Sequence, residues 1–266
     1  MPTWKLELEY EGTRYRGWQM QHLAKTIQGE MMNVTRELFS SPAEIFSGEP
    51  TTAGVHALGQ VVHLKVSELK VDLKPAQILK EFNELLPADI NIIRVANAAD
   101  SFHARKDAIA RYYLYQISTR RTAFGKNFVW WVKDTHDAKA MNEAAKMLVG
   151  RHNFRSFAEL EEDSRIPMIV DVRHAEVFTD GDLICFRMGA SHFLPMMMRR
   201  IVGLIAEVGR SDMSYDAFAR LLKFQSDVPA KFTAPPSGLF LEKVIYKGDR
   251  LIAESPSMRG AGILCN

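Results

Sequence analysis

A short polar loop holds the residues of this sequence that are best suited to covalent chemistry. The loop runs from residue 47 to residue 57 and contains Thr52 four positions before His56. A threonine hydroxyl is a weak nucleophile unless a neighbouring base removes its proton, and His56 is the titratable residue that follows most closely. One hypothesis is therefore a nucleophile and base formed by Thr52 and His56. The alternative is a loop without covalent chemistry.

Basic and aromatic residues are interleaved in the middle of the chain, between residues 101 and 126. The basic residues are Arg105, Lys106, Arg111, Arg120, Arg121 and Lys126, and the aromatic ones are Phe102, Tyr112, Tyr113, Tyr115 and Phe124. Asp107 is the single acidic residue there. Cations among aromatic rings suit phosphate neutralisation and base stacking. A strand with a solvated face is the alternative.

Composition sets wider limits. The chain has 266 residues, of which 47% are hydrophobic and 25% are charged, so it can form one large globular domain or two smaller ones. The longest apolar stretch, residues 192–209, is interrupted by Arg199 and Arg200 and is not expected to span a membrane. The two cysteines lie far apart, and no signal peptide is evident, so we expect a cytoplasmic protein with reduced thiols.

The histidines do not predict a metal site. His152 and His192 lack the paired Cys or His spacing that would complete a zinc site, so no metal and no cofactor is expected.

Hydrophobic periodicity predicts an α+β chain. We expect strands at residues 4–10, 43–47, 58–66, 91–96, 111–118, 168–178, 183–188 and 239–246. We expect helices at residues 26–39, 75–86, 137–148, 193–208 and 215–222. The strand, loop and helix that begin near residue 4 have a counterpart near residue 183, which indicates two related halves.

The polar loop resembles the active-site loop of the tRNA pseudouridine synthase A family, which reads Gly-Arg-Thr-Asp-Ala-Gly-Val-His-Ala. Further motifs match that family in the same order along nearly the whole chain. They include Tyr10-Glu11-Gly12-Thr13, Gly17-Trp18-Gln19, Phe102-His103-Ala104-Arg105, Ala110-Arg111 with Tyr113, and Arg199 with Ile201-Val202-Gly203. The resemblance implies two ferredoxin-like halves whose strands join in one mixed, largely antiparallel sheet, with a cleft between the halves. We expect the halves to be residues 1–105, with the loop, and 106–266, with the seam between 104 and 137.

The resemblance also implies a reaction. Members of the family isomerise uridine to pseudouridine in the tRNA anticodon stem-loop without metal or cofactor, on a base flipped out of the stack. An aspartate acts covalently, a tyrosine packs on the base, and an arginine holds the aspartate. The tyrosine corresponds to Tyr113 and the arginine to Arg199. The residues implied to contact RNA are Arg14, Arg16, His56, His103, Arg105 and Arg111, and a homodimer is implied.

The sequence departs from the family pattern inside the loop itself. Thr52 stands where the aspartate is expected, Pro50 where an arginine is expected, and Glu49 where a glycine is usual. Proline has a fixed φ and no N–H donor, so it cannot replace the arginine. We therefore expect uridine isomerisation to be lost or strongly reduced. A catalytically silent tRNA binder or RNA chaperone is one alternative, and an active enzyme with a rerouted mechanism is another.

Arg199 loses its implied partner in this sequence. It lies in a predicted helix that is apolar almost all round, where an unpaired guanidinium is costly. We expect a bound anion or a carboxylate such as Glu49 beside it. The alternative is a side chain that reaches solvent at the helix end.

Overall fold

The computed structural model describes residues 1–39, 41–68, 73–134, 136–159 and 165–249, which form two compact units. The first unit contains residues 1–109 and 240–249, and the second contains residues 110–239. We expected halves of 1–105 and 106–266, whereas here the first unit also includes a strand from the end of the described chain. Within the described residues, no helix has the length and apolar character needed to cross a membrane.

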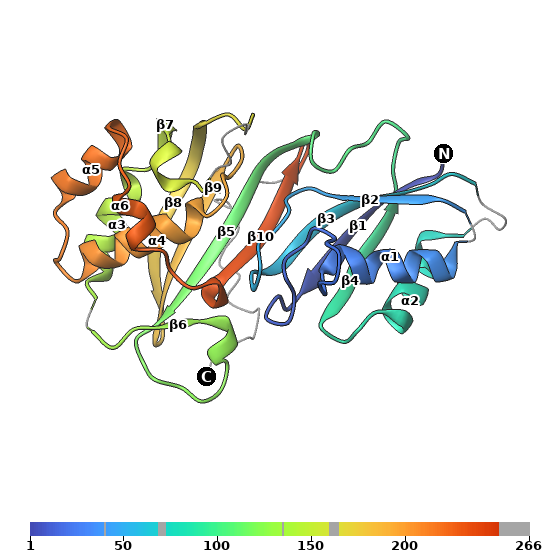
Figure 1. The fold of residues 1–266 in the computed structure, drawn as a ribbon, viewed down its shortest axis with the longest axis horizontal. Helices are drawn as coiled ribbons and strands as arrows, with labels where there is room; N and C mark the ends of the chain where they lie inside the picture. Colours follow the sequence, from blue (N-terminus) through green and yellow to red (C-terminus); the bar gives the residue numbers. More distant parts are fainter. Residues whose placement is uncertain (40, 69–72, 135, 160–164, 250–266) are drawn as a thin grey trace. The chain divides into compact units, whose positions relative to one another are not determined.

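The first unit is built on six consecutive elements (Figure 1). They are β1 (Thr3–Tyr10), α1 (Ile27–Leu38), β2 (Ala43–Ser47), β3 (His56–Val66), α2 (Pro75–Leu85) and β4 (Ile90–Asn97). Their strands pair in the order β4-β1-β3-β2, and each of these pairs is antiparallel. This order of elements and strands is that of a ferredoxin-like fold. Strand β10 (Leu239–Tyr246) adds a short parallel pairing to the start of β3.

Local sequence explains these elements. In β1, the side chains of Trp4, Leu6 and Leu8 alternate into the core, as the period of two predicts. Helix α1 begins after Thr26, whose side chain accepts a hydrogen bond from the Gly29 N–H and caps the helix. The predicted α+β class is confirmed.

The second unit contains strands β5 (Ala108–Ser118), β6 (Trp130–Trp131), β7 (Gly150–Asn153), β8 (Ile169–Asp180) and β9 (Leu183–Ala190). The order β5-β9-β8-β7 is antiparallel throughout, and β6 pairs in parallel with β5. Its helices are α3 (Ala138–Lys146), α4 (Met197–Gly209), α5 (Tyr215–Lys223) and α6 (Val228–Lys231).

An internal repeat relates the two units. The succession β5, α3, β8, β9, α4 repeats β1, α1, β2, β3, α2 with the same relative strand order. The strand and helix after residue 183 therefore correspond to β3 and α2, rather than to β1 and α1 as we expected. Loop and strand lengths hid this correspondence in the sequence.

Helix α4 begins at Met197, four residues later than predicted. Pro195 lies just before it, and Met196 has a φ of 66°, a left-handed conformation that ends the preceding turn. Strand β7 and helix α6 were not predicted because four residues are too few to show a hydrophobic period.

Candidate functional site

The polar loop between β2 and β3 is held by the segment that follows β1, and both belong to the first unit. The Trp18 N–H donates to the Thr51 carbonyl at 2.9 Å, and the Gly54 N–H donates to the Tyr15 carbonyl at 3.2 Å. These bonds attach both sides of the loop tip to one neighbouring segment. The position of residues 52 and 53 is therefore set by residues 12–18.

Two glycines allow this close approach. A Cβ on Gly12 would lie 2.0 Å from the Val55 carbonyl oxygen, and one on Gly17 would lie 2.7 Å from the Thr51 carbonyl oxygen. Gly17 also has a φ of +96°, a conformation that favours glycine. Both glycines belong to the motifs of the family resemblance, and the structure explains why a larger side chain would not fit there.

A buried polar network supports the loop from inside. The hydroxyls of Tyr10 and Thr51 share a hydrogen bond of 2.7 Å, and the Gln60 side-chain amide donates to the Tyr10 hydroxyl at 3.3 Å. The same amide bonds both the N–H and the carbonyl of Glu49. Burial raises the pKa of Tyr10 to about 12, so its hydroxyl stays protonated.

Gln60 was missed in the sequence, although a signal for it exists. It is a polar residue inside an otherwise apolar stretch of the predicted strand, and it is fully buried. Buried amides need hydrogen-bond partners, so an irregular loop beside this strand was the natural place to expect them.

Thr52 lies exposed at the tip of the loop. Its carbonyl accepts a hydrogen bond from the Val55 N–H at 3.2 Å, and this closes a tight turn at Gly54, where φ is 76°. Among the described residues, the Thr52 hydroxyl has no hydrogen-bond partner. The expected position thus carries an accessible hydroxyl with no base bound to it.

His56 supports the loop from a buried position. Its ring is 1% exposed, its Nδ1 accepts the Gly12 N–H at 3.0 Å, and it stacks on Phe240 at 4.8 Å. The structure does not bring His56 to Thr52 as a base. The contact of His56 with RNA that the resemblance implies stays a prediction, for a residue that is 1% exposed in this structure.

Arg14 and Arg16 differ in their surroundings. Arg14 forms an ion pair with Asp89, which also accepts a hydrogen bond of 2.6 Å from the Tyr15 hydroxyl. Burial opposes the charge of Asp89, but the bonds from Tyr15 and Arg14 outweigh it and hold the pKa of Asp89 below its usual value. The Arg16 side chain is exposed and forms no ion pair within the described part of the chain.

Two histidines shape the turn that carries Arg105. His63 Nδ1 accepts the Ala104 N–H at 3.0 Å, and His103 Nδ1 accepts the N–H of Arg105 at 3.3 Å and that of Lys106 at 3.4 Å. Burial, with a smaller contribution from neighbouring His103, lowers the pKa of His63 to about 4, so its ring stays neutral and able to accept. This turn presents Arg105 at the surface.

The remaining predicted residues lie in the second unit. Tyr113 is buried, and its ring meets Phe193 edge-on at 4.8 Å. Arg111 is buried, and its Nη1 donates to the Ser191 carbonyl at 3.0 Å. Both residues are therefore buried in the second unit, and a contact of Arg111 with RNA stays a prediction.

Arg199 is half-buried near the start of α4. Its Nε donates to the Ala234 carbonyl at 2.6 Å, and its Nη1 lies 3.5 Å from the sulfur of Met196. Burial lowers its pKa, and Tyr115 and Glu159 partly offset this effect. Within the described residues of its own unit, its hydrogen-bond partners are a backbone carbonyl and a thioether sulfur, and the Glu159 carboxylate acts on it electrostatically. The structure also excludes the alternative of a fully solvated side chain.

Among the described residues, no cluster of three or more His, Cys, Asp or Glu side chains could hold a metal ion.

Comparison with known proteins shows to which class of enzymes the chain is similar. A family model described as tRNA pseudouridine synthase matches residues 144–247, which lie mainly in the second unit. Relatives then extend the match over both units. "tRNA pseudouridine synthase A" of Dictyoglomus thermophilum is 35% identical over 248 residues, covering 92% of this chain and 100% of the relative. The proteins of the same name from Rhodopseudomonas palustris and Aquifex aeolicus are 36% and 32% identical, over 93% and 92% of this chain and 100% of each relative. The chain therefore belongs to the tRNA pseudouridine synthase A family.

Proposed function

We propose that this protein binds the anticodon arm of tRNA and that its uridine isomerisation is lost or strongly reduced. One observation carries the proposal: Thr52 occupies the tip of a fully braced loop, where its hydroxyl has no hydrogen-bond partner among the described residues. The loop retains its support and lacks a carboxylate at the position that the family pattern gives to the nucleophile.

The chemistry of residue 52 supports the loss of catalysis. A carboxylate is ionised at neutral pH, whereas a threonine hydroxyl needs a base to become a nucleophile. His56 already uses Nδ1 to accept the Gly12 N–H. Loss of a covalent nucleophile costs on the order of a millionfold in rate.

Exposed cations and rings support RNA binding. Arg16 and Arg105 are exposed in the first unit, and in the second unit the Arg121 guanidinium lies 5.8 Å from the centre of the half-exposed Trp131 ring. Phosphates and unpaired bases are the matching ligands for such groups. The relatives' name, tRNA pseudouridine synthase A, supports tRNA as the RNA.

The second candidate function is an enzyme with a rerouted mechanism. It would need a base at Thr52, and the accessible hydroxyl at the loop tip is the observation in its favour.

For the first candidate function we further propose that the tRNA binder is a cytoplasmic homodimer that acts as an RNA chaperone. Light scattering of the purified chain, with and without tRNA, tests the dimer.

The deciding experiment incubates the purified full-length protein with unmodified tRNA. Pseudouridine is then measured by nucleoside chromatography, and binding is measured by mobility shift at graded salt. We expect binding that weakens steeply with salt and no pseudouridine above background. Robust pseudouridine would refute the loss of catalysis, and the absence of binding at low salt would refute the RNA-binding role.

A further inference from the structure

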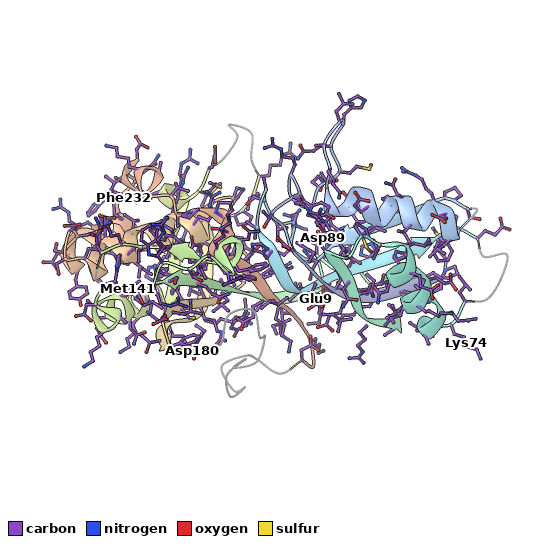
Figure 2. All side chains as sticks on the ribbon, turned by 90° about the horizontal axis from the view of Figure 1, so that it is seen from below. Glu9, Lys74, Asp89, Met141, Asp180 and Phe232 are labelled. Carbon is purple, nitrogen blue, oxygen red and sulfur yellow. The ribbon has the colours of Figure 1, made fainter. Side chains whose placement is uncertain are left out.

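The connection between β1 and α1 contains a narrow hairpin, residues 19–25, which we call the finger. A β-bridge between Gln21 and Ala24 closes its turn. In Figure 2 the finger is the thin blue hairpin that extends beyond helix α1. Two apolar side chains on it face solvent, because Leu23 is 96% exposed and Met20 is 49% exposed.

The base of the finger is fixed by hydrogen bonds on both strands. The Arg16 N–H donates to the Lys25 carbonyl at 2.9 Å, and the Met20 N–H donates to the side-chain oxygen of Gln28 at 2.9 Å. The amide nitrogen of Gln28 in turn donates to the Ile45 carbonyl at 2.9 Å. Helix α1 and strand β2 therefore hold the finger in place.

The tip of the finger combines a strained backbone with an exposed apolar side chain. Leu23 has a φ of 63°, a left-handed conformation that a Cβ disfavours. A single exposed leucine is ordinary, but this one combines full exposure with a strained backbone on a braced hairpin. Strained residues of this kind are concentrated at binding and catalytic sites.

The finger is directly connected to the polar loop. It begins one residue after Trp18, whose N–H bonds the Thr51 carbonyl, and two residues after Gly17, which packs against Thr51 and Thr52. The residues that contact Thr51 and Thr52 are therefore followed directly by the finger, so a ligand bound at Thr52 would lie next to the segment from which the finger projects.

Charge identifies the class of partner. The stretch from Gly12 to Gly29 contains Arg14, Arg16 and Lys25 and no aspartate or glutamate. Arg14 pairs with Asp89 and Lys25 with Glu30, whereas Arg16 is exposed and forms no ion pair among the described residues. The positive charge of Arg16 at the base of the finger favours a phosphate, and an apolar tip favours the faces of unpaired bases. RNA loops offer both, because their bases can be splayed apart and contacted on their faces.

We propose that the finger is an RNA-binding element whose Leu23 side chain inserts between unpaired bases of the anticodon loop. Apolar side chains inserted between base steps are an established way to unstack a nucleic acid. This inference rests on the proposed function, since it assumes that the anticodon arm binds beside Thr52. It adds a specific contact that involves neither the polar loop nor a phosphate.

The test uses the full-length chain and a synthetic anticodon stem-loop RNA with a fluorescent purine analogue in its loop. Leu23→Ala should weaken binding about tenfold, in line with the loss of one base-stacking contact. It should also abolish the fluorescence increase that unstacking produces at saturation. The salt slope should stay unchanged because no phosphate contact is lost. Leu85→Ala, which truncates an exposed leucine at the end of α2, is the matched control and should leave both signals intact.

A second variant separates contact from folding. Leu23→Gly relieves the left-handed strain, so the unfolding midpoint should not fall although RNA binding weakens. A merely structural role for Leu23 would lower both together and would refute the inference.

The outcomes also separate the inference from the proposed function. If the wild type binds neither this RNA nor whole tRNA at low salt, the proposed function and the role of the finger both fail. If the wild type binds and Leu23→Ala gives the same affinity and fluorescence, the role of the finger is refuted and the proposed function stands. The latter result is also expected if the apolar tip binds a protein.

Discussion

Thr51 and Thr52 are adjacent and chemically identical, yet their environments are opposite. The Thr51 side chain is buried and bonded to the Tyr10 hydroxyl, whereas Thr52 is exposed and its hydroxyl has no bonding partner in the described part of the chain. Thr51 therefore supports the structure of the loop, whereas the side chain at position 52 is accessible to a ligand. In this chain the scaffold is complete while the outer position lacks a carboxylate.

The largest stability effect is expected where the scaffold is tightest. Gly12→Ala places a Cβ 2.0 Å from the Val55 carbonyl oxygen, far inside van der Waals contact, so either the loop or the strand end must move. We expect a loss of about 3 kcal/mol in unfolding free energy, at the upper end of overpacking effects. Urea denaturation measures it. Gly181→Ala is the control, since nothing lies within 4 Å of its Cβ, and an equal loss in both variants would contradict the tight packing.

The free energy of unfolding should depend on pH because of His63, whose ring supports the turn that carries Arg105. The pKa of His63 is lowered from 6.5 to about 4 in the folded protein, so the unfolded chain takes up the proton first as the pH falls. Stability is full above about pH 6.5 and should decrease by about 1–3 kcal/mol as the pH falls toward 4.

Comparison of variants assigns this pH dependence to His63. His63→Asn, whose side-chain oxygen can still accept the Ala104 N–H, should flatten the profile measured by denaturation at several pH values. His22→Asn, at an exposed site, is the control. An unchanged slope in His63→Asn would show that other groups cause the pH dependence.

The two threonines provide a direct internal comparison. Thr51→Val removes a buried hydroxyl that bonds Tyr10, and we expect a loss of about 1–2 kcal/mol because Tyr10 loses a partner. Thr52→Val should change stability by less than about 0.5 kcal/mol, as is usual for exposed sites. Thermal unfolding of both variants checks this, and similar losses would remove the distinction between scaffold and tip.

The smallest effect concerns two neighbouring cations. Arg16→Gln should weaken tRNA binding a few-fold and lower the salt slope by about one unit, as expected for one lost phosphate contact. Arg14→Gln should change the slope less, because Asp89 already neutralises Arg14. Mobility shifts at graded salt compare the two variants. A larger effect at Arg14 would mean that its ion pair opens on binding.

Much of this organisation could be predicted from local sequence. Alternating and helical periods located most strands and helices because each has one buried face. The order of motifs located the loop and showed that Thr52, Pro50 and Glu49 depart from the family pattern. The left-handed Met196 was not predictable, and so α4 was placed too early.

Long-range contacts account for what could not be predicted. The bond of Gln60 to the Tyr10 hydroxyl and the pairing of Asp89 with Arg14 join residues far apart in sequence, so the partners could not be identified even where a buried polar residue such as Gln60 stands out. The burial of His56 follows from its stacking on Phe240, a residue at the other end of the described chain. The same distance in sequence hid the membership of β10 in the first unit.

A loop scaffold that is intact and lacks only its reacting group should regain activity when that group is restored. Pseudouridine formation in tRNA is measured for the wild type, for Thr52→Asp, and for the triple variant Glu49→Gly, Pro50→Arg, Thr52→Asp. We expect none from the wild type, little from the single variant because the loop still lacks its arginine, and a clear signal from the triple variant. Robust pseudouridine from the wild type would show that Thr52 does not abolish the reaction, and a triple variant that folds and binds tRNA but forms no pseudouridine would show that the scaffold is not intact.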